Sequence, residues 1–154
     1  MSGNYIRIGI FAPEDVLPYV SKITHVKHKE YCGKQVRMGS QRYVLFSEKG
    51  LTCVECGLKG RFFALEKQAQ EHDRFHFNMY GINSEGEEVL FTKDHIIPRS
   101  KGGANAQHNY QVMCSACNHE KDDKLELPET KRVKFTLADR LKASGTKISL
   151  LKVK

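Results

Sequence analysis

Two Cys-x-x-Cys pairs constrain this chain more than any other feature of its sequence. The first pair is Cys53-Val-Glu-Cys56 and the second is Cys114-Ser-Ala-Cys117. A two-residue spacer lets one tight turn direct two thiolates at one ion, and two such turns complete a tetrahedral Cys₄ zinc site. Because such a site has no open coordination position, we expect one structural zinc ion per chain. The 57 residues between the pairs then form an insert whose two ends the zinc clamps together.

The remaining cysteine, Cys32, is most simply a free thiol. The N-terminal stretch "MSGNYIRIGIFAPED" lacks a basic region followed by a long apolar run, and the chain has no stretch of about 18 apolar residues. We therefore expect a protein that stays in a reducing cytoplasm, without a membrane-spanning helix. An odd number of cysteines, five, in that compartment argues against a disulfide framework.

The charge balance indicates a polyanionic partner. Net charge is +7 and the pI is about 9.2, values that fit nucleic acid first and an acidic membrane surface second. The tail 131–154 concentrates this charge, with eight Lys or Arg residues against one acid. An ordinary basic protein whose charges are simply solvated is the alternative. The chain's 154 residues and 40% apolar content predict a modest core that needs a staple.

Hydrophobic patterning predicts a mixed α+β fold. Strands are expected over residues 4–12, over residues 41–46, and on both sides of the turn "NSEG" at residues 83–86, which forms a hairpin. Residues 13–23 fit a short helix broken by Pro18, and residues 62–74 fit either a helix or a polar loop. A last strand over residues 110–113 leads into a helix with Ser115 as its N-cap, which Pro128 ends.

The stretch "FTKDHIIPRSKGG", residues 91–103, places an acid and a histidine side by side at a predicted strand end. Asn118 directly follows the zinc ligand Cys117 and shares a helix face with Lys121 and Asp122. Asp94 and Asn118 offer the oxygen ligands that a hard cation prefers. His95, neutral at pH 7, can take a proton from a water molecule.

"DHIIPRSKGG", "HNY" and "CSACNHEK", in this order, resemble the HNH endonucleases, or ββα-metal nucleases, of the zinc-stapled kind found among phage-encoded enzymes. The resemblance covers about residues 51–125. It implies hydrolysis of DNA phosphodiester bonds in the host cytoplasm, with no small-molecule substrate, leaving 5′-phosphate and 3′-hydroxyl ends. The implied roles are a general base at His95, Mg²⁺ or Mn²⁺ on Asp94 and Asn118, a loop-tying Asn109, and zinc on Cys53, Cys56, Cys114 and Cys117.

The same resemblance divides the chain into an N-terminal extension (1–50), a zinc-stapled nuclease domain (51–125) and a basic tail (126–154). The extension and the tail are candidate DNA contacts. Within the nuclease domain, Arg99 and Lys101 follow the base in a loop where they can hold the DNA backbone, and Lys121 can neutralise a phosphate oxygen. Gly102 and Gly103 let that loop turn.

Two other functions fit parts of the sequence. A zinc-stapled nucleic-acid-binding protein with an inert nuclease centre would keep the cysteines, but it has no need of Asp94, His95, Asn109 and Asn118. A zinc deaminase uses a His-x-Glu motif before Pro-Cys-x-x-Cys, and His28-Lys29-Glu30 supplies the first half. However, Thr52 stands in place of the proline, and the second cysteine pair would be left without a role.

Overall fold

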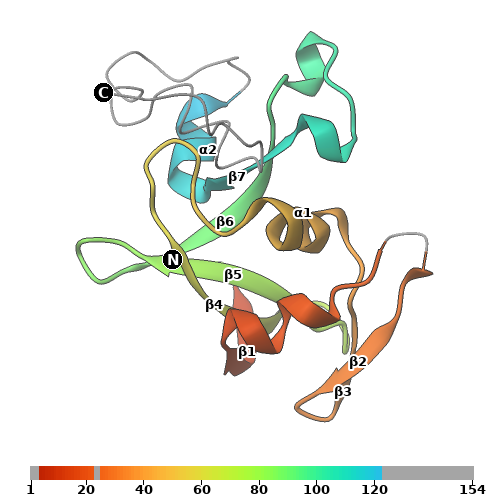
Figure 1. Cartoon of the computed structure of the whole chain (residues 1–154). Coiled ribbons are helices and arrows are strands. Elements are labelled where there is room, and N and C mark those ends of the chain that lie inside the picture. Colours follow the sequence, from red (N-terminus) through yellow and green to blue (C-terminus); the bar gives the residue numbers. More distant parts are fainter. Residues whose placement is uncertain (1–3, 23–24, 123–154) are drawn as a thin grey trace.

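The computed structural model of this chain describes residues 4–22 and 25–122, and the predictions for Pro128 and the basic tail lie outside them. Antiparallel strands and a few short helices make up this part, which confirms the predicted α+β class (Figure 1). The main sheet has five strands in the order β1-β4-β5-β6-β7. The strands are β1 (Tyr5–Phe11), β4 (Gly60–Gln68), β5 (His76–Ile82), β6 (Glu88–His95) and β7 (Tyr110–Cys114).

The hairpin predicted around "NSEG" is confirmed as β5 and β6. The side-chain oxygen of Asn83 accepts hydrogen bonds from the backbone N–H groups of Glu85 and Glu87, which closes the turn. The predicted strand at residues 110–113 is also confirmed, as β7. It pairs antiparallel with the C-terminal half of β6, so that Asp94 lies opposite Gln111 and His95 opposite Tyr110.

An aromatic cluster around Phe77 of β5 forms the centre of the core. Its ring meets those of Phe11, Tyr31 and Phe63 edge-on, at centroid distances of 5.7, 4.8 and 6.0 Å. Such T-shaped contacts add to the gain from burying the rings. Phe11 belongs to β1, which pairs with β4. Residues before position 50 therefore share a sheet and a core with those that follow.

The strand predicted over residues 41–46 is wrong, because this segment is the helix α1 (Gln41–Lys49). Its four consecutive apolar residues suited a buried strand, but the flanking residues favour a helix. The Ser40 hydroxyl accepts a hydrogen bond from the N–H of Tyr43 at 3.1 Å, and Gly50 ends the helix with φ at +90°. These start and stop signals decide the local structure.

Of residues 62–74, predicted as a helix or a polar loop, residues 62–68 form most of β4 and residues 69–74 form a loop. Phe63 and Leu65 face the core, while Glu66 faces the other side of the sheet. Glu66 is buried, and its carboxylate binds Arg7 at 2.7 Å and accepts hydrogen bonds from Asn78 and Tyr80. Good helix formers were misleading here because a long-range ion pair gives this glutamate a partner inside a sheet.

The described part also contains several smaller elements. Residues 13–22, the described part of the segment predicted as one short helix, instead contain two 3-10 turns, Pro13–Asp15 and Leu17–Tyr19. A separate hairpin consists of β2 (His28–Tyr31) and β3 (Lys34–Arg37). The helix predicted after the strand at residues 110–113 is α2 (Ser115–Lys121), but its N-cap is Cys114, and Ser115 is its first residue.

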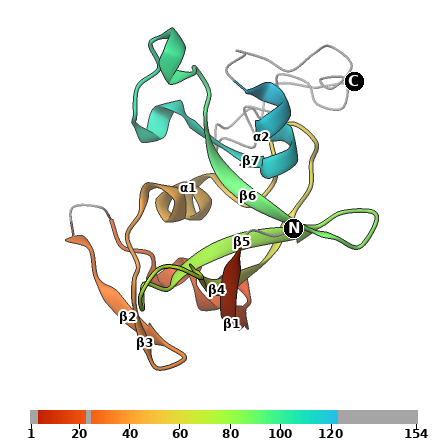
Figure 2. The same cartoon turned by 180° about the vertical axis from the view of Figure 1, so that it is seen from behind.

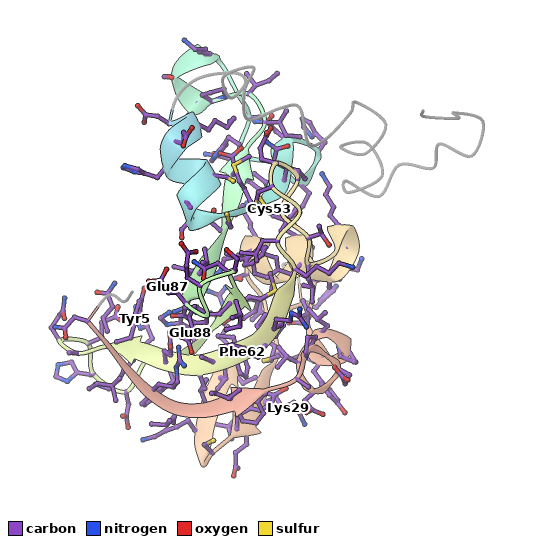
Figure 3. The ribbon with its side chains drawn as sticks, turned by 90° about the vertical axis from the view of Figure 1, so that its left-hand side faces the viewer. Tyr5, Lys29, Cys53, Phe62, Glu87 and Glu88 are labelled. Carbon is purple, nitrogen blue, oxygen red and sulfur yellow. The ribbon has the colours of Figure 1, made fainter. Side chains whose placement is uncertain are left out.

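Both cartoon views place α2, β7 and the β6 end at one extreme of the molecule and the β2–β3 hairpin at the other, with α1 between them (Figures 1 and 2). Cys53 lies near α2, far from Lys29 of the hairpin (Figure 3). In the described ranges, no helix combines the length and the hydropathy that a bilayer crossing demands.

Candidate metal and catalytic centre

The two cysteine pairs meet at one point. The four Sγ atoms of Cys53, Cys56, Cys114 and Cys117 lie within 4.8 Å of one another. The N–H of Val54 donates to the carbonyl of Val112 at 3.0 Å, which holds the first turn against β7. A second backbone hydrogen bond, from the N–H of Gly57 to the carbonyl of Cys53, closes the turn itself.

The cysteine cluster has the right size for a zinc ion. Zn–S bonds of about 2.3 Å in a tetrahedron require Sγ atoms about 3.8 Å apart, and Cys56 Sγ lies 3.8 Å from Cys114 Sγ. Hydrogen bonds within the cluster lower the pKa of the Cys53 and Cys56 thiols, towards the thiolate that metals bind, and raise the pKa of Cys114 and Cys117. The four cysteines can therefore hold a metal ion at the start of α2.

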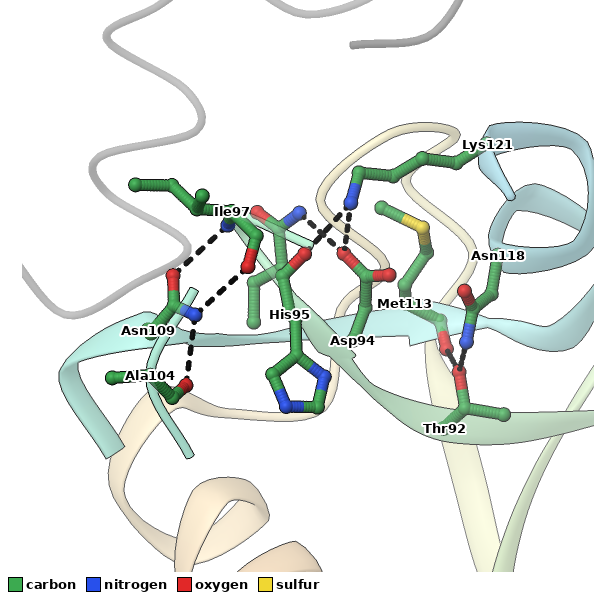
Figure 4. A network of polar contacts seen from close by, with 10 residues as sticks. Thr92, Asp94, His95, Ile97, Ala104, Asn109, Met113, Asn118 and Lys121 are labelled. Atoms are coloured by element: carbon green, nitrogen blue, oxygen red, sulfur yellow. Dashed lines mark hydrogen bonds and ion pairs between the residues drawn. The ribbon is translucent and has the colours of Figure 1, made fainter. Parts of the chain in front are cut away.

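Asp94 lies at the end of β6 and is only 5% exposed. Its Oδ2 atom is 3.0 Å from the ammonium of Lys121 and accepts a hydrogen bond from Gln111 at 2.9 Å (Figure 4). Lys121 also donates to the carbonyl of His95 at 2.7 Å. The ion pair compensates the buried carboxylate and fixes the last residues of β6 against α2.

Lys121 is therefore buried, unlike the exposed phosphate contact that the sequence predicted. Its residue exposure is 2%, and its ammonium is bound to the protein at two points. The sequence placed it correctly on the face of Asn118, but the spacing could not show that Asp94 would lie within reach. Arg99 and Lys101, in contrast, are exposed in the loop after β6.

The His95 imidazole extends from the end of β6 between two supports. Its Nε2 atom lies 2.7 Å from the amide oxygen of Asn105, and its ring meets the edge of Tyr110 at 5.1 Å. An amide oxygen only accepts, so this contact places the proton of a neutral imidazole on Nε2. Nδ1 then remains as the atom with a free lone pair.

Asn109 connects the two ends of the loop that follows His95. Its amide oxygen accepts from the N–H of Ile97, and its amide nitrogen donates to the carbonyls of Ile97 and Ala104 at 3.0 and 2.9 Å. Gly103 is required here, because a Cβ atom would overlap the carbonyl of Ile97. Gly102 turns the chain with φ at +89°. The loop is therefore fixed from inside.

Asn118, on the first turn after the cysteine pair, points towards β6. Its amide nitrogen donates to Thr92 Oγ1 at 2.8 Å, and Thr92 donates to the carbonyl of Met113. Because the Asn118 amide nitrogen donates this hydrogen bond, the amide oxygen is the atom that can bind a cation. Asp94, His95 and Asn118 line one cavity of about 320 Å³, whose walls include Arg99 and Lys121.

Sequence reasoning missed three side chains that support this cavity: Thr92, Asn105 and Gln111. Two of them had a signal. Thr92 precedes Asp94 by two residues, so a strand directs both to the same face. Asn105 is a polar residue inside the glycine-containing loop. The role of Gln111 is evident only from the pairing register of β6 and β7, which places it opposite Asp94.

Helix α1 also reaches the centre. The Gln41 side-chain oxygen accepts hydrogen bonds from Lys93 at 2.8 Å and from the Tyr110 hydroxyl at 3.0 Å. Lys49, near the other end of α1, donates to the carbonyls of Gln107 and Tyr110. The N-terminal part of the chain thus positions Tyr110, which in turn packs against His95. No sequence pattern predicts this connection, because its contacts join residues 41–49 to residues more than 50 positions later.

Comparison with known proteins identifies this part of the chain. The family model described as HNH endonuclease matches residues 83–134, which contain β6, the loop, β7 and α2. Residues 83–134 are therefore similar to the HNH endonuclease family. Searches of curated proteins and of solved structures gave no match. The cysteine cluster contains both pairs and, among the described residues, no histidine, which disfavours the deaminase alternative.

Replacing Lys121 with methionine tests the buried ion pair. The change keeps the length of the side chain but leaves the Asp94 carboxylate buried beside Gln111 alone. We expect the free energy of unfolding to fall by about 3 kcal/mol, because a buried charge without its partner is strongly destabilising. Urea unfolding without Mg²⁺ measures this change, and adding Asp94→Asn should restore part of the loss. A loss no larger than the roughly 1 kcal/mol of a surface pair would contradict this assignment.

Proposed function

We propose that this chain is a metal-dependent endonuclease that hydrolyses DNA phosphodiester bonds in the cavity at the end of β6. The observation that carries the proposal is the convergence of Asp94, His95 and Asn118 on that cavity, within a segment that matches the HNH endonuclease model. An acid, a base and an amide oxygen on one wall are the groups that metal-assisted hydrolysis needs.

His95 acts as the general base in this proposal. Asn105 holds the proton on Nε2, so that Nδ1 takes the proton of the attacking water. The edge-on ring of Tyr110 restricts the rotation of the imidazole. Asn109 has no direct part in the chemistry and keeps the loop that carries Asn105 in place. A positioned base of this kind contributes roughly 10²–10⁴-fold to the rate.

Asp94 and Asn118 supply the oxygen ligands for Mg²⁺ or Mn²⁺. When bound there, the divalent cation would contact the scissile phosphate and stabilise negative charge on the leaving 3′-oxygen. The side-chain exposures of Asp94 and Lys121 are only 6% and 3%, so the ion pair holds the carboxylate in one orientation inside the protein. We assign Lys121 to this positioning role, and Arg99 and Lys101 to contacts with the DNA backbone.

Zinc on Cys53, Cys56, Cys114 and Cys117 has a structural role in this proposal. It joins the turn before β4 to the start of α2, and the helix then carries Asn118 and Lys121 to the cavity. With four thiolates as ligands, a zinc ion held here would have no site for water or substrate. The catalytic cation and the zinc are therefore separate ions with separate functions.

Supercoiled plasmid incubated with the purified protein and Mg²⁺ tests the proposal. We expect conversion to the nicked or linear form by the wild-type protein, no conversion in EDTA, and none above background by His95→Ala. The alternative is an inert DNA-binding protein. It predicts that both proteins bind the plasmid equally and that neither changes its form, an outcome that would refute the proposed activity.

A further inference from the structure

A second cavity lies at the opposite end of the molecule from the catalytic one. The β2–β3 hairpin and the loop between β4 and β5 enclose it, with a volume of about 590 Å³. In both cartoon views this hairpin projects away from α2 and β7 (Figures 1 and 2). None of the residues that line this cavity lines the catalytic one.

The walls of this cavity are rich in groups that donate to anions. Arg37, His28 and Gln35 come from the hairpin, and Arg74 and His72 come from the loop. Among the residues that the structure describes, neither guanidinium has an ion pair or a hydrogen bond to another side chain. Both arginines are exposed and line the same cavity, so one anion bound there can pair with both.

The one carboxylate in the wall is already neutralised. Asp73 binds the ammonium of Lys34 at 2.9 Å, and this contact lowers the pKa of Asp73. It also ties the hairpin to the loop, because Lys34 belongs to β3. Phe75 is buried, and Lys34 lies 5.5 Å above its ring. The cavity thus keeps its arginines available while Asp73 acts as a brace.

The hairpin segment beside the cavity also carries a net positive charge. Residues 25–37 contain four lysines or arginines, namely Lys27, Lys29, Lys34 and Arg37, against one acid, Glu30. Arginine guanidinium groups match phosphate oxygens in bidentate geometry, and histidine and glutamine side chains add single donors. The buried Phe75 is the only apolar side chain in the lining, which suits a sugar–phosphate chain better than an apolar ligand.

We propose that this cavity binds the phosphate backbone of the DNA substrate at a position remote from the cut. The inference rests on the proposed function for the identity of the polyanion. One duplex would then contact the protein at both ends, through the loop after β6 and through the β2–β3 hairpin. The hairpin supplies affinity, while the cavity at the end of β6 carries out the reaction.

The test compares Arg37→Gln/Arg74→Gln with wild-type protein in DNA binding. Fluorescence anisotropy with a labelled duplex of about four helical turns, in EDTA at several salt concentrations, measures affinity without cleavage. Each lost phosphate contact lowers the slope of log affinity against log salt by about 0.9, so we expect weaker binding and a slope reduced by roughly 1.8. Thermal unfolding checks that the variant keeps its fold.

Lys22→Gln/Arg61→Gln is the matched control, because it removes the same charge from exposed residues that line neither cavity. An equal loss of affinity and slope in the control would overturn the inference in favour of general charge. Unchanged DNA binding by Arg37→Gln/Arg74→Gln would also overturn it. In that case, calorimetric titration with inorganic phosphate distinguishes a small-anion site from an empty one. Because DNA binding is measured in EDTA, the result of this test does not depend on whether the protein cleaves DNA.

Discussion

Cys53→Ser is expected to leave the chain unable to fold. A structural zinc site contributes its binding free energy directly to folding, on the order of 10 kcal/mol or more at pH 7. The whole stability of a domain this size is about 5–15 kcal/mol, so loss of the site removes most of it. Circular dichroism should show a chain without a cooperative thermal transition. Metal analysis should find one zinc per wild-type chain and substantially less in the variant.

Cys32→Ser is the control for this experiment. Cys32 lies at the tip of the β2–β3 hairpin, is exposed, and is not one of the four clustered cysteines. We expect this variant to keep the wild-type zinc content and melting temperature to within a few degrees. A Cys53→Ser protein that folds and melts like the wild type would contradict a structural role for the cluster.

His95→Ala should lower the cleavage rate by roughly 10²–10⁴-fold while folding and DNA binding change little, because the loss is that of a positioned general base. The side chain is half-buried, and its contacts are one hydrogen bond to Asn105 and the edge of Tyr110, so the core loses little. The rate is measured under single-turnover conditions with Mg²⁺ and saturating protein, which separates chemistry from binding.

His108→Ala serves as the matched histidine control. His108 lies in the same loop region but is exposed and does not line the catalytic cavity. We expect it to cleave at nearly the wild-type rate. Cleavage by His95→Ala at that same rate would remove His95 from the mechanism.

The sequence predicted best where short motifs determine local geometry. Each Cys-x-x-Cys spacing defines one tight turn, and the strand pattern before Asp94 defines where β6 ends. These two features were enough to expect that Asp94, His95 and Asn118 would converge. The β5–β6 hairpin followed in the same way from its Asn-Ser-Glu-Gly turn.

The features that the sequence did not reveal depend on contacts between distant segments. Residues 41–46 looked like a strand because their apolar run fits either structure when buried, and only the caps at Ser40 and Gly50 separate the two. Glu66 stands in a strand because Arg7 reaches it from β1, 59 residues away in sequence. The pairing of Lys121 with Asp94 likewise depends on how α2 packs on β6, which helix periodicity alone does not give.

Mapping the ends of cleaved DNA tests the central claim most directly. Zinc-loaded wild-type protein is incubated with an end-labelled duplex and with plasmid in Mg²⁺ or Mn²⁺, and the products are analysed for their terminal groups. We predict cleavage that depends on the divalent cation and leaves 5′-phosphate and 3′-hydroxyl ends, which DNA ligase can rejoin without repair. Folded, zinc-containing protein that binds DNA but leaves every substrate intact would contradict the account.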